Sequence, residues 1–492
     1  TTLSEIRGLE FDHVFLAGLC DGDFPTRYSP EIFFSPSYMK DEIKHQGEER
    51  YHFYQALCSW KKRLYLTLPS NDEKKELVES NFLTEFTNLF GVSEKTEKDF
   101  EDTLFSREEV LEFIGNRGVE NVKNNESIKE YDIDIHMIEE AIKINELRTN
   151  NPFGDSEFTG NILENLSADS KAKLAEYKKR NYSISQLETY AKCPYKYFAE
   201  RVLKLEPVEE PTEEIESLEM GTLLHSILFE FYVELNRKNI ILQKSSGRDF
   251  DFAYKLIFRI AEEKIEKANF RSPVSFFEKE KVLGIKGDRK NSLLFKFLTA
   301  EKDNTDGFTP RYFERAFGQF GNANDKNSSL TDFTVRDINV RGKIDRIDIS
   351  EADEKFKVID YKIGGKIPTA KDLLEGISLQ LPLYMYAAKK LIEAQLSVDS
   401  EPSSAEIYSL KFSDSDFGRK QIKNSESRKR NISEDDYISA NNELINICLD
   451  SIEKYVKSIV NGRFNLTTLK DRENKVCKYC NFKSICRIQE VN

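Results

Sequence analysis

Apolar and polar positions alternate along two short segments in the second half of the chain, and this pattern predicts two β-strands. The segments are RGKIDRIDI at 341–349 and KFKVIDYKIGG at 355–365. Side chains along a strand alternate between its two faces, so Asp360 and Lys362 share a face of the second strand. The connection between the segments is short enough for an antiparallel pair. That pairing would place Asp345 of the first strand beside Asp360.

The periodicities along the rest of the chain indicate three regions. Residues 1–90 contain two apolar runs, at 13–19 and 64–68, separated by a helical pattern, which predicts buried strands from one half of an α/β sheet. Residues 91–180 are polar with two helical stretches, near 108–114 and 137–147, and are predicted to be a helical connector. Residues 181–492 combine strong helices with short strands. We expect an α/β architecture there, with a central mixed sheet flanked by helices.

Composition is that of a soluble globular protein, with 39% hydrophobic and 32% charged residues among 492. The sequence contains no apolar run of about 18 residues, so no membrane contact is expected. A net charge of −13 means that a nucleic acid would have to be held by a local basic groove. Seven cysteines and no secretory signal favour a reducing, cytoplasmic setting, and the start at Thr1 suggests a piece of a longer chain.

The paired carboxylates suggest a metal site. Two carboxylates held close together repel each other, and a divalent cation with phosphate oxygens in its shell relieves that repulsion. Such a cation assists phosphodiester hydrolysis. Lys362 would orient or deprotonate the water, or offset charge in the transition state, and the sequence does not choose between these roles. A D-x-K triplet alone is more often a surface ion pair.

The spacing of Asp345, Asp360 and Lys362 on consecutive strands resembles the PD-(D/E)XK nuclease superfamily. The upstream segment GTLLHSILFEFY is similar to its RecB and AddB branch, which implies that His225 binds a metal, Mg²⁺ or Mn²⁺, with Asp345 and Asp360. His225 borders the buried stripe of its predicted helix, where a histidine is most often simply packed.

Two further positions follow from the same resemblance. In QLPLYMYAAKKL, Gln380 and Tyr384 lie at i and i+4 on one helical face. The branch carries a Q-x-x-x-Y pair here, which implies that both residues are catalytic and sit over the active site, although Tyr384 could equally be a core aromatic. Glu314 in RYFERAFG resembles an early strand glutamate of the family and is expected to support the site from outside the ligand set.

Four cysteines form a second candidate site. Cys477, Cys480 and Cys486 cluster as C-x-x-C-x5-C near the end of the sequence, and Cys193 stands alone in AKCPYKYFAERVL. Thiolates suit zinc or iron–sulfur clusters, and unligated thiols remain the simple alternative. The arrangement resembles that of AddB subunits, which implies a 4Fe-4S cluster rather than zinc, in a structural role. The other cysteines, Cys20, Cys58 and Cys448, are expected to be core thiols.

RGLEFDHVFLAGL and YQALCSWKKRLYL in the first region resemble late motifs of UvrD-like superfamily I helicases. Those motifs normally end in an arginine that contacts ATP phosphate, and here Ser59 stands at that position. The sequence also contains no G-x-x-x-x-G-K-[ST] phosphate loop. Residues 1–90 are therefore expected to be an inactive remnant of the second helicase motor domain.

Contacts to DNA are expected where cations alternate with aromatics, because aromatic rings stack on the bases of single strands. These positions are Lys192, Tyr195, Lys196, Tyr197 and Arg201. Such a run is more often a solvated face.

Taken together, the motifs resemble the C-terminal part of an AddB-type helicase–nuclease subunit. The resemblance implies a metal-dependent exonuclease that cuts single-stranded DNA, the strand ending 5′, during double-strand-break resection and recombinational repair. An AddA-like motor subunit is the implied partner. Two alternatives stay open: a non-catalytic scaffold that binds DNA ends, and a stand-alone nuclease similar to those of CRISPR adaptation.

Overall fold

The computed structural model contains two compact units, residues 1–135 and 136–492. The division falls inside the segment predicted as a connector. Each unit is described by itself. The residues that the structure describes are 2–3, 5–29, 41–72, 75–96, 106–122, 130–206, 217–268, 273–319, 328–330, 333–350, 352, 354–364, 367–413, 415–422 and 433–490.

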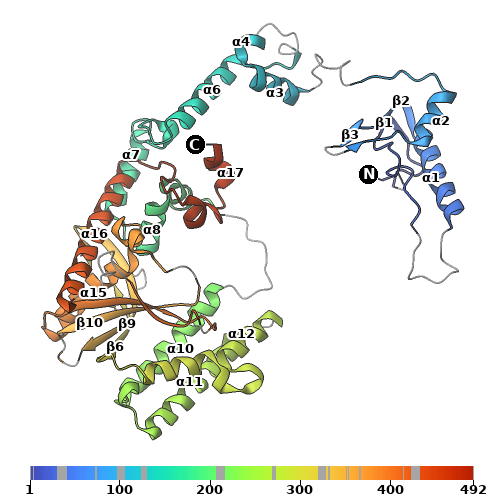
Figure 1. The fold of residues 1–492 in the computed structure, drawn as a ribbon. Helices are drawn as coiled ribbons and strands as arrows, with labels where there is room; N and C mark the ends of the chain where they lie inside the picture. The colour runs from blue at the N-terminus through green and yellow to red at the C-terminus, as the bar shows by residue number, and fades with distance from the viewer. Residues whose placement is uncertain are drawn as a thin grey trace. The chain divides into compact units, whose positions relative to one another are not determined.

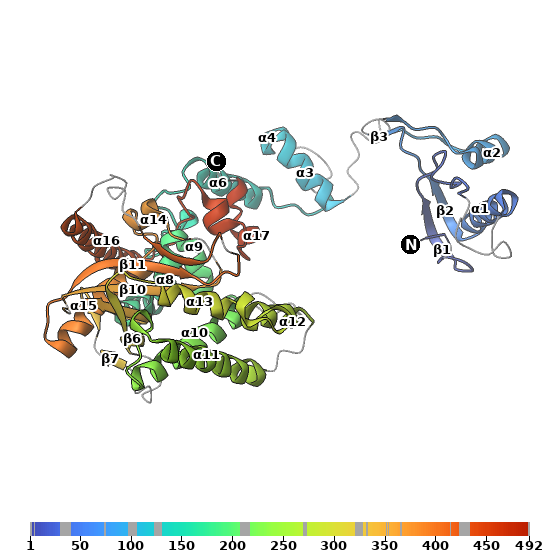
Figure 2. The ribbon, with the colours of Figure 1, turned by 60° about the horizontal axis from the view of Figure 1, so that its bottom comes forward.

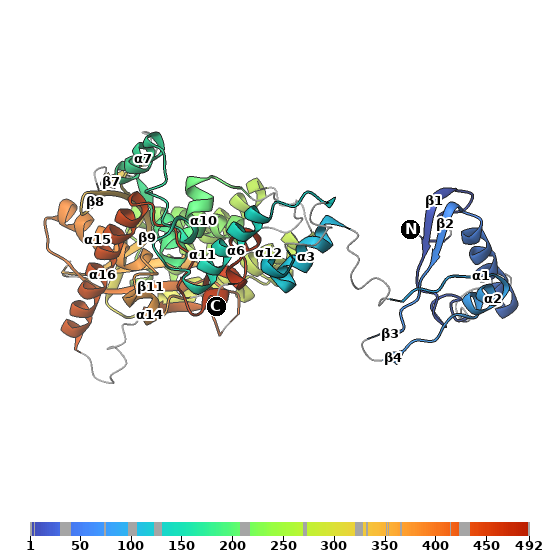
Figure 3. The same cartoon turned by 90° about the horizontal axis from the view of Figure 1, so that it is seen from above.

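The first unit contains the predicted strand, helix and strand. Strands β1 (Phe11–Leu16) and β2 (Trp60–Leu66) pair in parallel, and helices α1 (Glu42–Leu57) and α2 (Asn81–Leu89) pack against them (Figure 3). The expected burial of the strands is wrong, because Phe15 is 69% exposed and Phe11 40%. Only one face of this two-stranded sheet is covered by the described helices. The unit also contains β3 (Asn71–Asp72), β4 (Lys75–Glu76), α3 (Arg107–Arg117) and α4 (Val119–Val122).

The second unit is built on an eight-stranded mixed sheet in which β10 lies between β9 and β11 (Figure 1). The strand order is β12-β11-β10-β9-β6-β7, and β5 and β8 pair with β9 outside this path. Strands β10 and β11 run parallel, whereas β9 is antiparallel to both β6 and β10. The bounds are β5 (Tyr182–Ser183), β6 (Phe308–Phe317), β7 (Ser328–Leu330), β8 (Thr334–Val335), β9 (Ile338–Ser350), β10 (Lys355–Lys362), β11 (Glu401–Ser409) and β12 (Gly418–Gln421).

Helices cover both faces of this sheet, as Figure 2 shows. Val358 packs in one core with α8 (Ile184–Lys192), α15 (Gln380–Leu396) and α16 (Glu434–Val460). The next residue along β10, Ile359, packs in the other core with α10 (Ser217–Arg237), α11 (Gly247–Ala268) and α13 (Leu293–Lys302). The period-two alternation of the strand thus supplies both cores, and the predicted mixed sheet between helical layers is confirmed.

The remaining helices of the second unit are shorter, apart from α6, which confirms the helix expected near residues 137–147. They are α6 (Ile135–Asn150), α7 (Ala168–Ala175), α9 (Pro194–Tyr197), α12 (Pro273–Leu283), α14 (Ala370–Leu374), α17 (Lys483–Cys486), η2 (Glu157–Thr159), η3 (Glu176–Lys179), η4 (Phe198–Val202), η5 (Leu242–Lys244), η6 (Ile285–Gly287), η7 (Arg289–Asn291), η9 (Glu473–Cys477) and η10 (Ile488–Glu490). Within the described part of the chain, no helix has the length and apolar character needed to cross a membrane.

A fully buried ion network joins the sheet to the α10 side. The Arg346 guanidinium donates to both carboxylate oxygens of Asp348, at 2.5 and 2.7 Å, and lies 2.7 Å from Glu301. Glu301 also accepts hydrogen bonds from Tyr232 and Arg419. Because Arg346 directly follows Asp345 along β9, its side chain points to the opposite face of the sheet from that carboxylate.

Candidate active site

Three carboxylates lie in line across three neighbouring strands. Register pairs on either side place Glu314 of β6 opposite Asp345 of β9, and continuing the β9–β10 ladder one step places Asp360 opposite Asp345 as well. The predicted antiparallel pairing of the two D-containing strands is therefore confirmed. Close repulsion between the carboxylates adds to burial in raising the pKa of Asp360.

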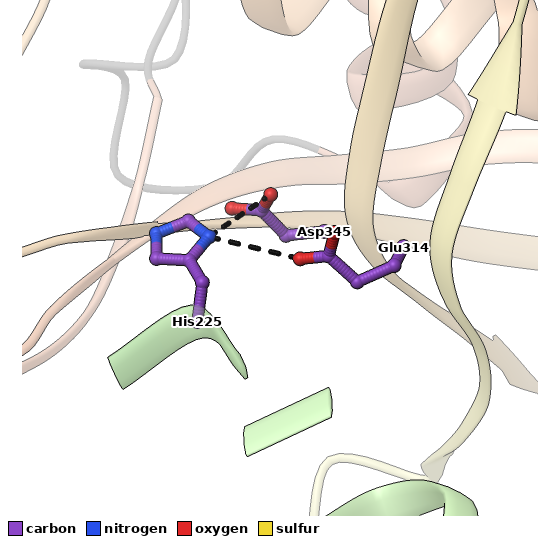
Figure 4. A group of neighbouring side chains, drawn as sticks. All are labelled: His225, Glu314 and Asp345. Atoms are coloured by element: carbon purple, nitrogen blue, oxygen red, sulfur yellow. Dashed lines mark ion pairs between the residues drawn. The ribbon is translucent and has the colours of Figure 1, made fainter. Parts of the chain in front are cut away.

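Helix α10 brings His225 to this row of carboxylates (Figure 4). Its Nε2 lies 3.0 Å from the backbone carbonyl of Tyr361, and because a carbonyl only accepts, Nε2 carries the hydrogen. Its Nδ1 faces Asp345 Oδ1 at 3.4 Å and Glu314 Oε1 at 3.8 Å. The ring orientation thus directs a nitrogen with a free lone pair, in the neutral form, toward the carboxylates.

The two carboxylates keep His225 protonated in the absence of a cation. Burial lowers the pKa of the imidazole, but hydrogen bonds and charge from Asp345 and Glu314 outweigh burial and raise it to about 10. Glu314 in turn has a lowered pKa, because His225 and Lys343 overcome the effect of its burial. A proton on Nδ1 and a metal cation would therefore compete for the same position.

Asp345 and Asp360 are held by backbone and side-chain donors. The Tyr361 N–H donates to Asp345 Oδ2 at 2.9 Å, and the Gln380 amide Nε2 donates to Asp360 Oδ1 at 2.7 Å. Asp360 Oδ2 is buried without a hydrogen bond, although Lys362 Nζ lies 3.0 Å away as an ion pair. Burial and the charge of Asp345 raise the pKa of Asp360 to about 6, against the opposing effect of Lys362.

Lys362, Gln380 and Tyr384 form a hydrogen-bonded row beside Asp360. Lys362 Nζ donates to Gln380 Oε1 at 3.2 Å, and Gln380 Nε2 also lies 3.2 Å from the Tyr384 hydroxyl. Burial disfavours the Lys362 ammonium, but attraction to Asp360 raises its pKa above the usual value. Tyr384 is 6% exposed and packs edge-on against Phe317, so it is both a core aromatic and a partner of Gln380.

The donor set fits a divalent cation. Ligand atoms of His225, Glu314 and Asp345 all lie within 4.8 Å of one another, and carboxylate oxygens with an imidazole suit Mg²⁺ or Mn²⁺. The buried, unpaired oxygen of Asp360 offers a further acceptor on the next strand. Glu314, expected to support the site from outside, stands instead among the three closest ligand atoms.

Glu314 reaches this position through an unusual backbone conformation. Its φ is 49°, inside β6, where a non-glycine residue is strained by about 1–3 kcal/mol. Strain of this kind is concentrated at functional sites. No sequence signal for this conformation exists at Glu314, because neither glycine nor asparagine marks the position.

Comparison with known families accounts for most of the chain. Residues 181–487, well over half of the sequence, match the PD-(D/E)XK nuclease superfamily. The chain belongs to this superfamily. Residues 1–71 match the UvrD-like helicase C-terminal domain, so the expected pairing of these two modules is confirmed.

Relatives of this PD-(D/E)XK chain share one description, that of the B-type subunit of an ATP-dependent helicase/deoxyribonuclease. One such protein, from Clostridium botulinum (strain Loch Maree / Type A3), is 22% identical over 99% of this chain and 47% of its own length. The Bacillus subtilis protein of the same description is 24% identical over 97% of this chain and 46% of its own length. The chain thus spans about half the length of these relatives, and the predicted AddB-type character is confirmed.

The cysteines of the PD-(D/E)XK domain converge without forming a compact ligand group. Burial raises the pKa of the Cys193 thiol to about 11, and Cys480, Cys486 and Cys477 add to that rise, which places all three in its electrostatic surroundings. The compact three-ligand group among the described residues contains no cysteine. An iron–sulfur cluster therefore stays a prediction. Cys58 is exposed, which corrects its expected place in the core.

Most residues expected to contact DNA are engaged within the protein. Lys192 pairs with Glu188 at 3.6 Å, and Lys196 pairs with Glu200 at 3.5 Å. Tyr197 is 1% exposed and packs edge-on against Tyr190, so the structure corrects the expectation that its ring stacks on a base. The expected contacts that keep exposed or partly exposed side chains are Lys192, Tyr195, Lys196 and Arg201.

Proposed function

We propose that this chain is the nuclease-bearing part of a helicase–nuclease subunit and hydrolyses single-stranded DNA with Mg²⁺ or Mn²⁺ during processing of double-strand breaks. The observation that carries the proposal is the convergence of His225, Glu314 and Asp345 beside the Asp360–Lys362 pair. Superfamily membership and relatives named as deoxyribonuclease subunits support the same reaction class.

Each residue has a defined task in this proposal. His225, Glu314 and Asp345, with the free oxygen of Asp360, would hold the cation, which polarises the phosphodiester and lowers the pKa of a water. Lys362 acts as a fixed positive charge, because its raised pKa keeps it protonated at neutral pH, where it offsets charge on the attacked phosphate. Gln380 fixes the relative positions of Asp360 and Lys362 by bonding both.

A second cofactor is proposed at the cysteines. Cys193, Cys477, Cys480 and Cys486 would hold a 4Fe-4S cluster, because four thiols in one electrostatic environment are a suitable donor set, with zinc as the less favoured alternative. Its role would be to tie the last residues of the domain to the end of α8.

The first unit and the partner complete the proposal. The UvrD-like segment would not hydrolyse ATP, since Ser59 is buried and donates its hydroxyl hydrogen to the Ala56 carbonyl. An AddA-like motor would deliver the DNA strand, in keeping with the description of the relatives as subunits. DNA as the substrate and seven cysteines outside disulfides favour a cytoplasmic location.

A cleavage assay on the purified full chain tests this proposal. Labelled single-stranded DNA is incubated with Mg²⁺ or Mn²⁺, and we expect shortening by the parent chain and none by Asp360→Ala. Glu354→Ala is the matched control, because it removes an exposed carboxylate just before the same strand. Binding without cleavage by the parent chain would support the scaffold alternative instead. Cleavage that survives Asp360→Ala would refute the assigned site.

A further inference from the structure

Helix α15, which carries Gln380, begins without a cap of its own. Its N-cap residue is Leu379, whose side chain has no acceptor for the first backbone N–H groups. Pro382 in the first turn has no N–H to satisfy. The N–H groups of Leu379 and Gln380 therefore need an acceptor from elsewhere in the protein.

That acceptor is Glu188 of α8, 191 residues earlier along the chain. Its Oε1 accepts from the Leu379 N–H at 2.8 Å and from the Gln380 N–H at 3.1 Å. The side chain is 18% exposed, so these bonds are partly shielded from water. A carboxylate at this end of a 17-residue helix also interacts favourably with the helix dipole.

The residue held by Glu188 is the one that bridges the catalytic pair. Gln380 Nε2 donates to Asp360 Oδ1 at 2.7 Å, and Gln380 Oε1 accepts from Lys362 at 3.2 Å. Both bonds require the amide to stay within a few tenths of an ångström of its place. The first backbone group of α15 thus determines whether one side chain reaches both partners.

Helix α8 itself is firmly anchored. The Lys192 carbonyl accepts from Thr467 Oγ1 at 2.6 Å, and the Tyr190 hydroxyl donates to the Arg463 carbonyl at 2.6 Å. Cys193, one of the four candidate cluster ligands, ends this helix as its C-cap. Glu188 is therefore attached to a fixed element, and α15 is positioned from it.

We propose that Glu188 is a positioning residue of the nuclease site: by capping α15 it fixes Gln380, and through Gln380 it sets the geometry of Asp360 and Lys362. This inference rests on the proposed nuclease function. Glu188 lies too far along the sequence from the motifs to be found by spacing, and it contacts neither the cation ligands nor the phosphate.

The test compares Glu188→Ala with Glu188→Gln in the full chain. Glutamine keeps an oxygen that accepts from the two N–H groups, whereas alanine leaves them without an acceptor. For alanine we expect kcat on single-stranded DNA to fall roughly 10-fold or more, as for other residues that orient metal-site groups, with KM for DNA unchanged. Weaker Mn²⁺ binding, measured by electron paramagnetic resonance without DNA, should accompany the fall, and glutamine should restore most of both.

Asp436→Ala is the control for mere loss of a helix cap. Asp436 accepts from the Ser433 N–H and hydroxyl at the start of α16, away from the catalytic pair. This variant should lower the melting temperature without changing kcat or Mn²⁺ binding. If Glu188→Ala behaves in the same way, or if glutamine is as impaired as alanine, the positioning role is refuted.

Failure of the parent assignment gives a different result. If the parent chain neither binds Mn²⁺ nor cleaves DNA, the proposed nuclease function is overturned and the role of Glu188 falls with it. If the parent chain cleaves and Asp360→Ala does not, while Glu188→Ala matches the parent, only the inference about Glu188 is overturned.

Discussion

A divalent cation must displace a proton from His225 before it can bind Nδ1. The two carboxylates that face this nitrogen raise the pKa of the imidazole to about 10 in the metal-free protein. At pH 7.5 the neutral imidazole is therefore a minor species. Metal binding and proton release are expected to be linked at this site.

The size of the linkage follows from the pKa. About 2.5 pH units separate pH 7.5 from the pKa of His225, and this difference costs the cation about 3 kcal/mol of binding free energy. Apparent affinity should rise about tenfold per pH unit between roughly pH 7 and 9. Below about pH 6, Asp360 is protonated as well, which makes the dependence on pH steeper there.

Calorimetric titration with Mn²⁺ measures this linkage directly. In buffers with different ionisation enthalpies at about pH 7.5, the dependence of observed enthalpy on the buffer gives the number of protons released, and we expect about one. His225→Ala should bind Mn²⁺ more weakly and release almost none. Proton release that is absent in the parent chain, or that persists unchanged in His225→Ala, would refute the reasoning.

Three further predictions follow from the same contacts. Glu314→Gln should weaken Mn²⁺ binding at least about 10-fold in paramagnetic resonance titrations, because it removes a charged ligand atom, and unchanged affinity would exclude Glu314 from the ligand set. Arg346→Leu should lower the free energy of unfolding by about 3–5 kcal/mol in urea, because two buried carboxylates lose their partner; the exposed Arg237→Leu should cost under about 1 kcal/mol, and equal losses would contradict this account. Cys480→Ser should abolish bound iron and sulfide and lower the melting temperature, whereas the exposed Cys58→Ser should do neither; zinc in place of iron would overturn the cluster assignment.

The core of the candidate site could be predicted from local patterns. Alternation along β9 and β10 and the short connection between them were enough to bring Asp345 beside Asp360. Helical spacing also placed His225 at the border of a buried stripe, and Gln380 four residues before Tyr384. Each of these inferences needs only a period and a short loop.

Other parts depend on contacts that no period encodes. The place of Glu314 follows from the pairing of β6 with β9 and from a left-handed backbone at one residue, and neither is visible in the sequence. Glu188 meets Gln380 only because α8 packs beside the start of α15. In the first unit, an apolar run predicted buried strands, but Phe15 remains exposed because no described element covers that face.

The location of a bound cation tests the central claim most directly. Crystals of the full chain grown with Mn²⁺ would reveal the ion by its anomalous scattering. We predict one peak bonded to His225 Nδ1 and to carboxylate oxygens of Asp345 and Glu314, with Asp360 next to it. A saturating Mn²⁺ concentration that leaves this position empty, or a peak on another face of the sheet, would contradict the assignment of these residues as a nuclease site.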